Sequence, residues 1–134
     1  ALTASLGADL AAEYFGENHR GGDGVRPATG LDVRPGDLRA VKARASAFFP
    51  GNCDLPDQLK ARGVAQVLIA GLVTSVCCES SARDACELGY QVTMVSDALG
   101  GQSFGVHEAS LAVFFRNFGD VRPSEEVIQL LRSR

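Results

Sequence analysis

Short apolar runs alternate with helical patterns along most of the chain. Residues 64–70, bounded by glycine on both sides, and residues 91–96 have the apolar pattern typical of buried parallel strands. Each run is followed by apolar residues at helical spacing, in residues 75–88 and 106–118. Because strict alternation of strand and helix favours right-handed βαβ units, we expect a three-layer α/β/α fold with a mostly parallel sheet.

Weaker patterns predict four more elements. A turn at Pro35-Gly-Asp37 leads into a short strand over residues 38–42, and Asp54 is expected to cap a helix over residues 54–62. Residues 119–121 read as a short edge segment. Ser124 is expected to cap a last helix, whose Val127, Leu130 and Leu131 pack inward.

The first 36 residues are the least regular part of the chain. Apolar residues recur every four positions between Leu2 and Phe15, which permits one short helix. The glycine, proline and scattered charge of residues 16–35 predict a loop. His19 lies in that loop, and we expect it to be solvated rather than a ligand.

Composition narrows the possible functions. The chain has 134 residues, 46% of them hydrophobic, and a net charge of −3 without any strongly basic block. We therefore expect one domain that binds neither nucleic acid nor membranes. No apolar run approaches the roughly 20 residues of a membrane span. Four cysteines without a C-x-x-C spacing favour reduced thiols in the cytoplasm, with no metal and no cofactor.

Cys77 is the candidate nucleophile. Thr74 or Ser75 could cap the helix that follows residues 64–70, which would place Cys77 in the first helical turn. The helix dipole there favours a thiolate, and the unpaired amides could hold an oxyanion. Simple packing of two adjacent cysteines is the alternative. Cys78 points about 100° further round the helix, with Ala82 and Ala85, and is expected to pack against the sheet.

Three segments are expected to meet at one edge of the sheet. Lys42, residues 71–77 and residues 97–101 all follow predicted strands, and parallel α/β sheets place their sites beyond the carboxyl ends of the strands. Lys42 is therefore expected within reach of Cys77, although on its own it could be a solvated lysine. The glycines at 100 and 101 predict a bend near the site. His107 is interpreted as a surface or capping residue.

Three segments of the sequence resemble the isochorismatase-like cysteine hydrolases, which include nicotinamidases, N-carbamoylsarcosine amidohydrolase and ureidoacrylate amidohydrolases. Val41-Lys-Ala-Arg-Ala-Ser-Ala-Phe-Phe49 resembles their lysine segment, and Gly71-Leu-Val-Thr-Ser-Val-Cys77 with the helix after it resembles their nucleophile segment. Gly89-Tyr-Gln-Val-Thr-Met-Val-Ser-Asp-Ala98 resembles the strand that follows. The resemblance runs from about Arg34 to the C-terminus.

The resemblance implies a site and a mechanism. Family catalysis uses a Cys, a Lys and an Asp, and the first two match Cys77 and Lys42. A non-proline cis peptide is implied at Val73–Thr74, with the amides of Thr74 and Cys77 as the oxyanion hole. Phe48, at the end of the matching Ser-x-Phe, is expected to bind substrate.

The acidic residue of the family has no match. It comes from an N-terminal strand of the form apolar-x-Asp-x-Gln, whereas Asp9, Asp23 and Asp32 follow no β-branched apolar run. The metal-binding cluster of the nicotinamidases is also not visible. Residues 1–134 are therefore expected to be one isochorismatase-like domain that is N-terminally incomplete. We expect the missing strand upstream of Ala1 or from another chain, and a homo-oligomer would shield the exposed sheet edge.

The leading function is hydrolysis of a small-molecule amide, carbamoyl or ureido compound through a covalent Cys77 intermediate. The residues of the lysine segment and those around Cys77 resemble the ureido and carbamoyl branch of the family more closely than the nicotinamidases. An isochorismatase-type hydrolase and a non-catalytic family member acting in assembly are the alternatives. A redox sensor built on Cys77 and Cys78 ranks last, because adjacent cysteines form only a strained disulfide.

Overall fold

The computed structural model describes residues 30–133. The chain divides into two compact units, Ala1–Asp37 and Leu38–Arg134. The described end of the first unit is a turn, in which the guanidinium of Arg34 pairs with Asp32 and its amide donates to Asp37 Oδ2 over 2.8 Å. The expected helix within residues 2–15 and the loop around His19 lie outside the described residues.

The second unit is built on a three-stranded parallel sheet. Its strands are β1 (Gln66–Leu72), β2 (Gln91–Gly100) and β3 (Asp120–Arg122), in the order β1-β2-β3. The β1–β2 register shifts between Ile69 and Gly71, where the two strands come together closely. A Cβ at Gly100 would lie 2.2 Å from Leu72 Cδ2, so only glycine fits there without displacing Leu72. The predicted parallel sheet is confirmed.

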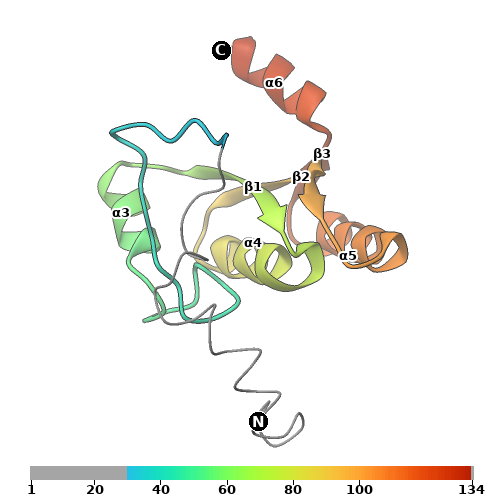
Figure 1. The fold of residues 1–134 in the computed structure, drawn as a ribbon, viewed down its shortest axis with the longest axis horizontal. Helices are drawn as coiled ribbons and strands as arrows, with labels where there is room; N and C mark the ends of the chain where they lie inside the picture. The colour runs from blue at the N-terminus through green and yellow to red at the C-terminus, as the bar shows by residue number, and fades with distance from the viewer. Residues whose placement is uncertain (1–29, 134) are drawn as a thin grey trace, which may run out of the picture. The chain divides into compact units, whose positions relative to one another are not determined.

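Helices cover both faces of this sheet (Figure 1). Val92 and Met94 of β2 pack with α4 (Glu79–Glu87) and α5 (Phe104–Asn117) in the main core. Val95 is also buried but lies outside that core, because side chains alternate along a strand. On the second face, α6 (Ser124–Arg132) packs against β2. The three-layer α/β/α arrangement expected from the sequence is confirmed.

The predicted inward stripe of α4 is confirmed. Cys78, Ala82 and Ala85 are all buried in the main core. One turn of π-helix, η2 (Thr74–Cys78), precedes α4. Neither Thr74 nor Ser75 caps it, which contradicts the prediction, because Val73 occupies the N-cap position and no side chain caps the turn.

The predicted strand over residues 38–42 is wrong. The segment from residue 38 to residue 53 is irregular, and its backbone bonds to side chains instead of to a neighbouring strand. The carbonyl of Arg39 accepts from Gln58 Nε2 over 3.2 Å, and the amide of Ala43 donates to Asn52 Oδ1 over 2.8 Å. These bonds replace the ladder that a strand requires.

The predicted helix caps at Asp54 and Ser124 are also wrong. Asp54 precedes α3 (Leu55–Ala61), but its side chain makes no capping bond. Pro123 occupies the N-cap position of α6, and Ser124 bonds to Asp97 of β2 instead. Both helices therefore begin where the sequence indicates, with different partners.

β2 is longer than the strand predicted over residues 91–96. β2 continues through Gly100, and Ser103 caps α5 by accepting a hydrogen bond from the amide of Val106. Because α5 begins at Phe104, His107 lies in its first turn instead of opening the helix.

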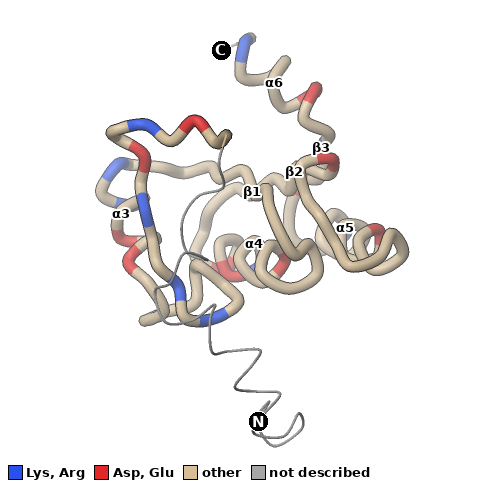
Figure 2. Tube along the Cα trace, viewed as in Figure 1, with Lys and Arg blue, Asp and Glu red and all other residues tan. Residues whose placement is uncertain are grey.

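Charge is dispersed over the described residues (Figure 2). Lysine, arginine and aspartate mix along the segment that leads into α3, whereas β1 carries no charged residue. No helix within residues 30–133 is long and apolar enough to cross a bilayer.

Candidate active site

Cys77 lies in the π-helical turn that directly follows β1. The chain enters this turn through Gly71, whose φ of +116° suits glycine, and through a cis peptide bond between Leu72 and Val73. That bond lies one residue earlier than the Val73–Thr74 bond implied by the resemblance, so the expected position was wrong. Cys77 itself is a free, half-buried cysteine.

Lys42 and Cys77 meet, as the sequence predicted. The ammonium nitrogen of Lys42 lies 3.5 Å from the sulfur of Cys77, and it also donates to the carbonyl of Arg44 over 3.0 Å. An ammonium group at this range stabilises negative charge on a sulfur atom. Lys42 approaches from the irregular segment and not from a strand end, so the contact was predicted for the wrong reason.

Asn52 braces the segment that carries Lys42. Its Oδ1 accepts from the amide of Ala43, and its Nδ2 donates to the carbonyl of Ser46. The amide of Ala47 donates to Ser81 Oγ on α4 over 3.0 Å, which ties the segment to the helix that follows Cys77. The sequence pattern did not indicate this role for Asn52, because its partners lie six and nine residues away in an irregular loop.

Cys78 differs from its neighbour in environment. It is buried in the core, and this burial raises the pKa of its thiol above the ordinary 9.0. A negative charge on Cys77 raises that pKa further, while Lys42 lowers it. Cys78 is therefore a packing residue whose thiol stays protonated at neutral pH.

His107 joins α5 to the cysteine turn. Its Nδ1 lies 2.9 Å from the hydroxyl oxygen of Thr74, the first residue of η2. The histidine side chain is only 15% exposed, and its Nε2 lies 3.9 Å from Glu108. The prediction of a surface or capping residue is therefore wrong. The position of His107 shortly after β2, near the edge of the sheet where the site was expected, could have indicated that it lies close to the site.

Phe48 is a core residue. It is 3% exposed, and its ring packs edge-to-face on Tyr90 with the centroids 5.6 Å apart. The side chain expected to bind substrate is thus enclosed by core residues instead of facing the cysteine. An apolar residue in an irregular segment gave no periodicity from which its direction could be predicted.

Asp97 directly follows the strand predicted over residues 91–96, but its carboxylate is bonded to Ser124 and not to the site. Its carboxylate accepts from both the hydroxyl and the amide of Ser124, each over 2.7 Å. These bonds hold the pKa of Asp97 below its ordinary 3.8, the hydroxyl contributing most. Within residues 30–133, no carboxylate contacts Lys42 or Cys77.

Glu79 links the two helices that cover the main core. It forms an ion pair with Arg83, one turn further along α4. Glu79 is half-buried, however, and its second oxygen accepts from Ser110 Oγ of α5. Its carboxylate is therefore used to join α4 to α5, and it is not available to Cys77.

Backbone amides of the turn divide into two groups. The amides of Val76 and Cys78 both donate to the carbonyl of Val73, over 3.1 and 3.2 Å. They are therefore not available to a ligand. The amides of Thr74 and Cys77 are not among the donors to Val73. No group of three histidine, cysteine or acidic side chains is placed to hold a metal in the part of the chain that the structure describes.

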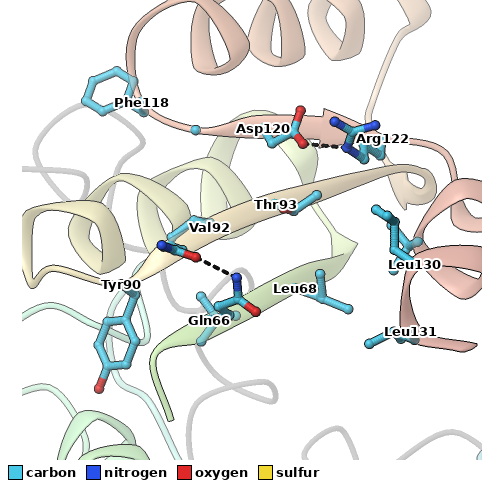
Figure 3. Close-up of a pocket in the computed structure, with 14 residues that line it drawn as sticks. Gln66, Leu68, Tyr90, Val92, Thr93, Phe118, Asp120, Arg122, Leu130 and Leu131 are labelled. Atoms are coloured by element: carbon cyan, nitrogen blue, oxygen red, sulfur yellow. Dashed lines mark hydrogen bonds and ion pairs between the residues drawn. The ribbon is translucent and has the colours of Figure 1, made fainter. Parts of the chain in front are cut away.

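A groove of about 740 Å³ lies on the opposite face of the sheet (Figure 3). Leu68 of β1 and Leu130 and Leu131 of α6 line it, with an Asp120–Arg122 ion pair beside them. Its other lining residues include Gln66, Tyr90 and Gln91, at the amino ends of the strands. The groove is therefore remote from the thiol chemistry, which lies beyond the carboxyl end of β1.

The parallel α/β fold, with a lysine-paired cysteine beyond the end of β1, is shared with a family of hydrolases, as comparison with known proteins shows. The isochorismatase domain model matches residues 7–126. The isochorismatase family protein YwoC of Bacillus subtilis is 34% identical over 132 residues, covering 94% of this chain and 69% of that protein. The chain belongs to the isochorismatase family.

Two further proteins of known activity or structure are similar to this chain. The ureidoacrylate amidohydrolase RutB of Agrobacterium fabrum is 44% identical over 68 residues, covering 51% of this chain and 29% of RutB. A cysteine hydrolase of Pseudomonas syringae has the same fold, with a TM-score of 0.83 and 31% identity. That match covers 93% of this chain and 63% of the solved structure, so this chain is shorter than its relatives.

Proposed function

We propose that the chain is the thiol-bearing part of a hydrolase of small amide, carbamoyl or ureido compounds, with Cys77 as the nucleophile. The observation that carries this proposal is the 3.5 Å contact between Lys42 Nζ and Cys77 Sγ. Family membership supports it, as does the naming of RutB as a ureidoacrylate amidohydrolase.

The residues can perform the first half of the reaction. The Cys77 thiolate attacks the carbonyl carbon, a C–S bond forms, and the C–N bond breaks. The Lys42 ammonium stabilises the thiolate and supplies the proton that the departing nitrogen takes up. The amide of Cys77 is the candidate to hold the negative oxygen of the tetrahedral intermediate, whereas Thr74, proposed with it from the resemblance, is 0% exposed. Phe48 has no part in this scheme, because it is buried.

The second half is hydrolysis of the acyl-cysteine. Water adds to its carbonyl carbon, the C–S bond breaks, and the acid leaves as the thiol is restored. This step is aided by a general base. The family resemblance assigns that role to an aspartate, whereas Asp97 and Glu79 are both engaged elsewhere. We propose that the base comes from outside residues 30–133 of this chain.

The test is an assay of the 134-residue chain against carbamoyl, ureido and simple amide substrates, with Cys77→Ser as the matched control. We expect an acyl adduct on the Cys77 peptide by mass spectrometry and ammonia release that the control lacks. An adduct without turnover identifies the missing base as the limiting part. Turnover that persists in Cys77→Ser contradicts the proposal, and a chain that forms no adduct fits a non-catalytic family member.

A further inference from the structure

The hydroxyl group of Thr74 is buried completely and has one side-chain partner. Thr74 is 0% exposed and opens the π-helical turn three residues before Cys77. Its Oγ1 lies 2.9 Å from Nδ1 of His107, which comes from α5. A buried hydroxyl that loses its partner destabilises the folded chain, so this contact favours one position of the turn.

This contact ties the turn to a separate element of the fold. Within the described residues, it is the sole side-chain hydrogen bond between η2 and α5. The turn also has backbone bonds: the carbonyl of Val73 accepts from the turn, and the amide of Glu79 in α4 donates to the carbonyls of Thr74 and Val76. The Lys42–Cys77 bond, in contrast, comes from the irregular segment. Two side-chain bonds from two different elements therefore add to the backbone bonds and the buried Cys78 in holding the turn.

The surroundings of His107 are restricted. A Cβ added at Gly101 would lie 3.2 Å from Cβ of His107, so this glycine, directly after β2, lets the backbone pass close to the histidine. Glu108 lies 3.9 Å from Nε2 and is itself exposed. The imidazole thus bonds to Thr74, and among the described residues no hydrogen bond or ion pair joins it to Cys77.

We infer that His107 is a positioning residue for the nucleophile, which acts through Thr74 to hold the cysteine turn where Cys77 meets Lys42. The inference deepens the proposed function and rests on it, but its main readout does not require turnover. Alkylation of Cys77 by iodoacetamide reports the reactivity of the thiol directly. A displacement of the sulfur by about 1 Å is enough to change reaction rates by up to about a hundredfold.

The experiment compares the 134-residue chain with His107→Ala, His107→Asn, Thr74→Val and the matched control Glu108→Gln. Asparagine can place its amide nitrogen close to the position of Nδ1, whereas alanine cannot. We expect His107→Ala to slow alkylation of Cys77 by about tenfold at neutral pH. His107→Asn should recover most of the rate, and Glu108→Gln should leave it unchanged. Circular dichroism checks that each variant is folded.

A double-mutant cycle separates positioning from general stability. If His107 acts through Thr74, His107→Ala should have little further effect on alkylation once Thr74 is valine. Wherever the wild type turns over an amide, kcat should fall in the single variants while KM changes little. Additive effects, or an alkylation rate unaffected by His107→Ala in a folded chain, overturn the inference. Failure of the proposed function has a different signature, namely reactive Cys77 that never turns over any substrate.

Discussion

Lys42 Nζ lies 3.5 Å from Cys77 Sγ across 35 residues of sequence, and no strand brings the lysine there. A loop braced by Asn52 delivers the ammonium group, while β1 and its π-helical turn deliver the sulfur. The two reactive groups are therefore carried by different parts of the chain, and the following predictions change one part at a time.

Removal of the Lys42 charge should slow the chemistry of Cys77. Lys42→Met keeps the length of the side chain but not the ammonium, so the thiolate loses its stabilising partner. We expect the rate of Cys77 alkylation to fall by about tenfold. Lys42→Arg keeps a positive charge, so its alkylation rate should lie between those of the wild type and Lys42→Met. Equal rates in all three folded chains would exclude Lys42 from the site.

The two adjacent cysteines should behave differently towards alkylating reagents. Because burial raises the pKa of Cys78, the thiolate form of Cys78 is scarce at neutral pH. Peptide mapping after brief iodoacetamide treatment should find the label on Cys77. Cys77→Ser should lose the label and remain folded, whereas Cys78→Ala should keep the label and lose about 1 kcal/mol of unfolding free energy. The reverse result would mean that the helix register is different.

Weakening of the Asn52 brace should reduce reactivity while the main core stays intact. Asn52→Ala removes the bonds to both Ala43 and Ser46, whereas Asn52→Asp keeps an acceptor for the Ala43 amide. We expect the rate of Cys77 alkylation to decrease in the order wild type, Asp variant, Ala variant. Near-ultraviolet circular dichroism of Tyr90 serves as the control for the core, because that ring packs on Phe48.

The bond between Asp97 and Ser124 should make stability depend on pH. The pKa of Asp97 is lowered in the folded chain, so its contribution is fully present above the ordinary value of 3.8 and is lost as the pH falls through the lowered pKa. Asp97→Asn should therefore lower the melting temperature at pH 7. The difference from wild type should shrink as the pH is taken below 3.8.

Ser124→Ala is the matched variant for that experiment. It removes the hydroxyl donor but keeps the backbone amide of residue 124 as a donor to Asp97. It should therefore lower the melting temperature less than removal of the carboxylate does. A constant difference between wild type and Asp97→Asn at every pH would contradict the assigned cause.

The sequence predicted those parts of the fold that follow a regular hydrophobic period. The parallel strands and the stripe of Cys78, Ala82 and Ala85 are of this kind, since burial repeats with the backbone geometry. The strand predicted over residues 38–42 failed because Asn52 and Gln58 satisfy that backbone instead. Such bonds join a side chain to a distant backbone group and leave no periodic pattern.

For the candidate site, the sequence predicted the residues that belong to motifs but not the polar contacts between distant residues. The segment containing Cys77 has a recognisable motif, and Lys42 belongs to another. The pairing of Thr74 with His107 joins residues 33 positions apart through one polar contact, so nothing local in the sequence marks it. Phe48 lies within the lysine motif, but the motif could not show that its ring turns into the core.

The composition of β1 has a consequence for how this polypeptide behaves in a test tube. The strand has neither charge nor proline, and its Leu68 and Leu72 are 49% and 74% exposed. Uncharged apolar segments of this length are the usual nuclei of cross-β aggregation, because nothing on them repels a second copy. Refolding yield should therefore fall steeply with protein concentration. A gatekeeper substitution such as Leu68→Lys, on the face away from Cys77, should raise that yield without touching the thiol chemistry.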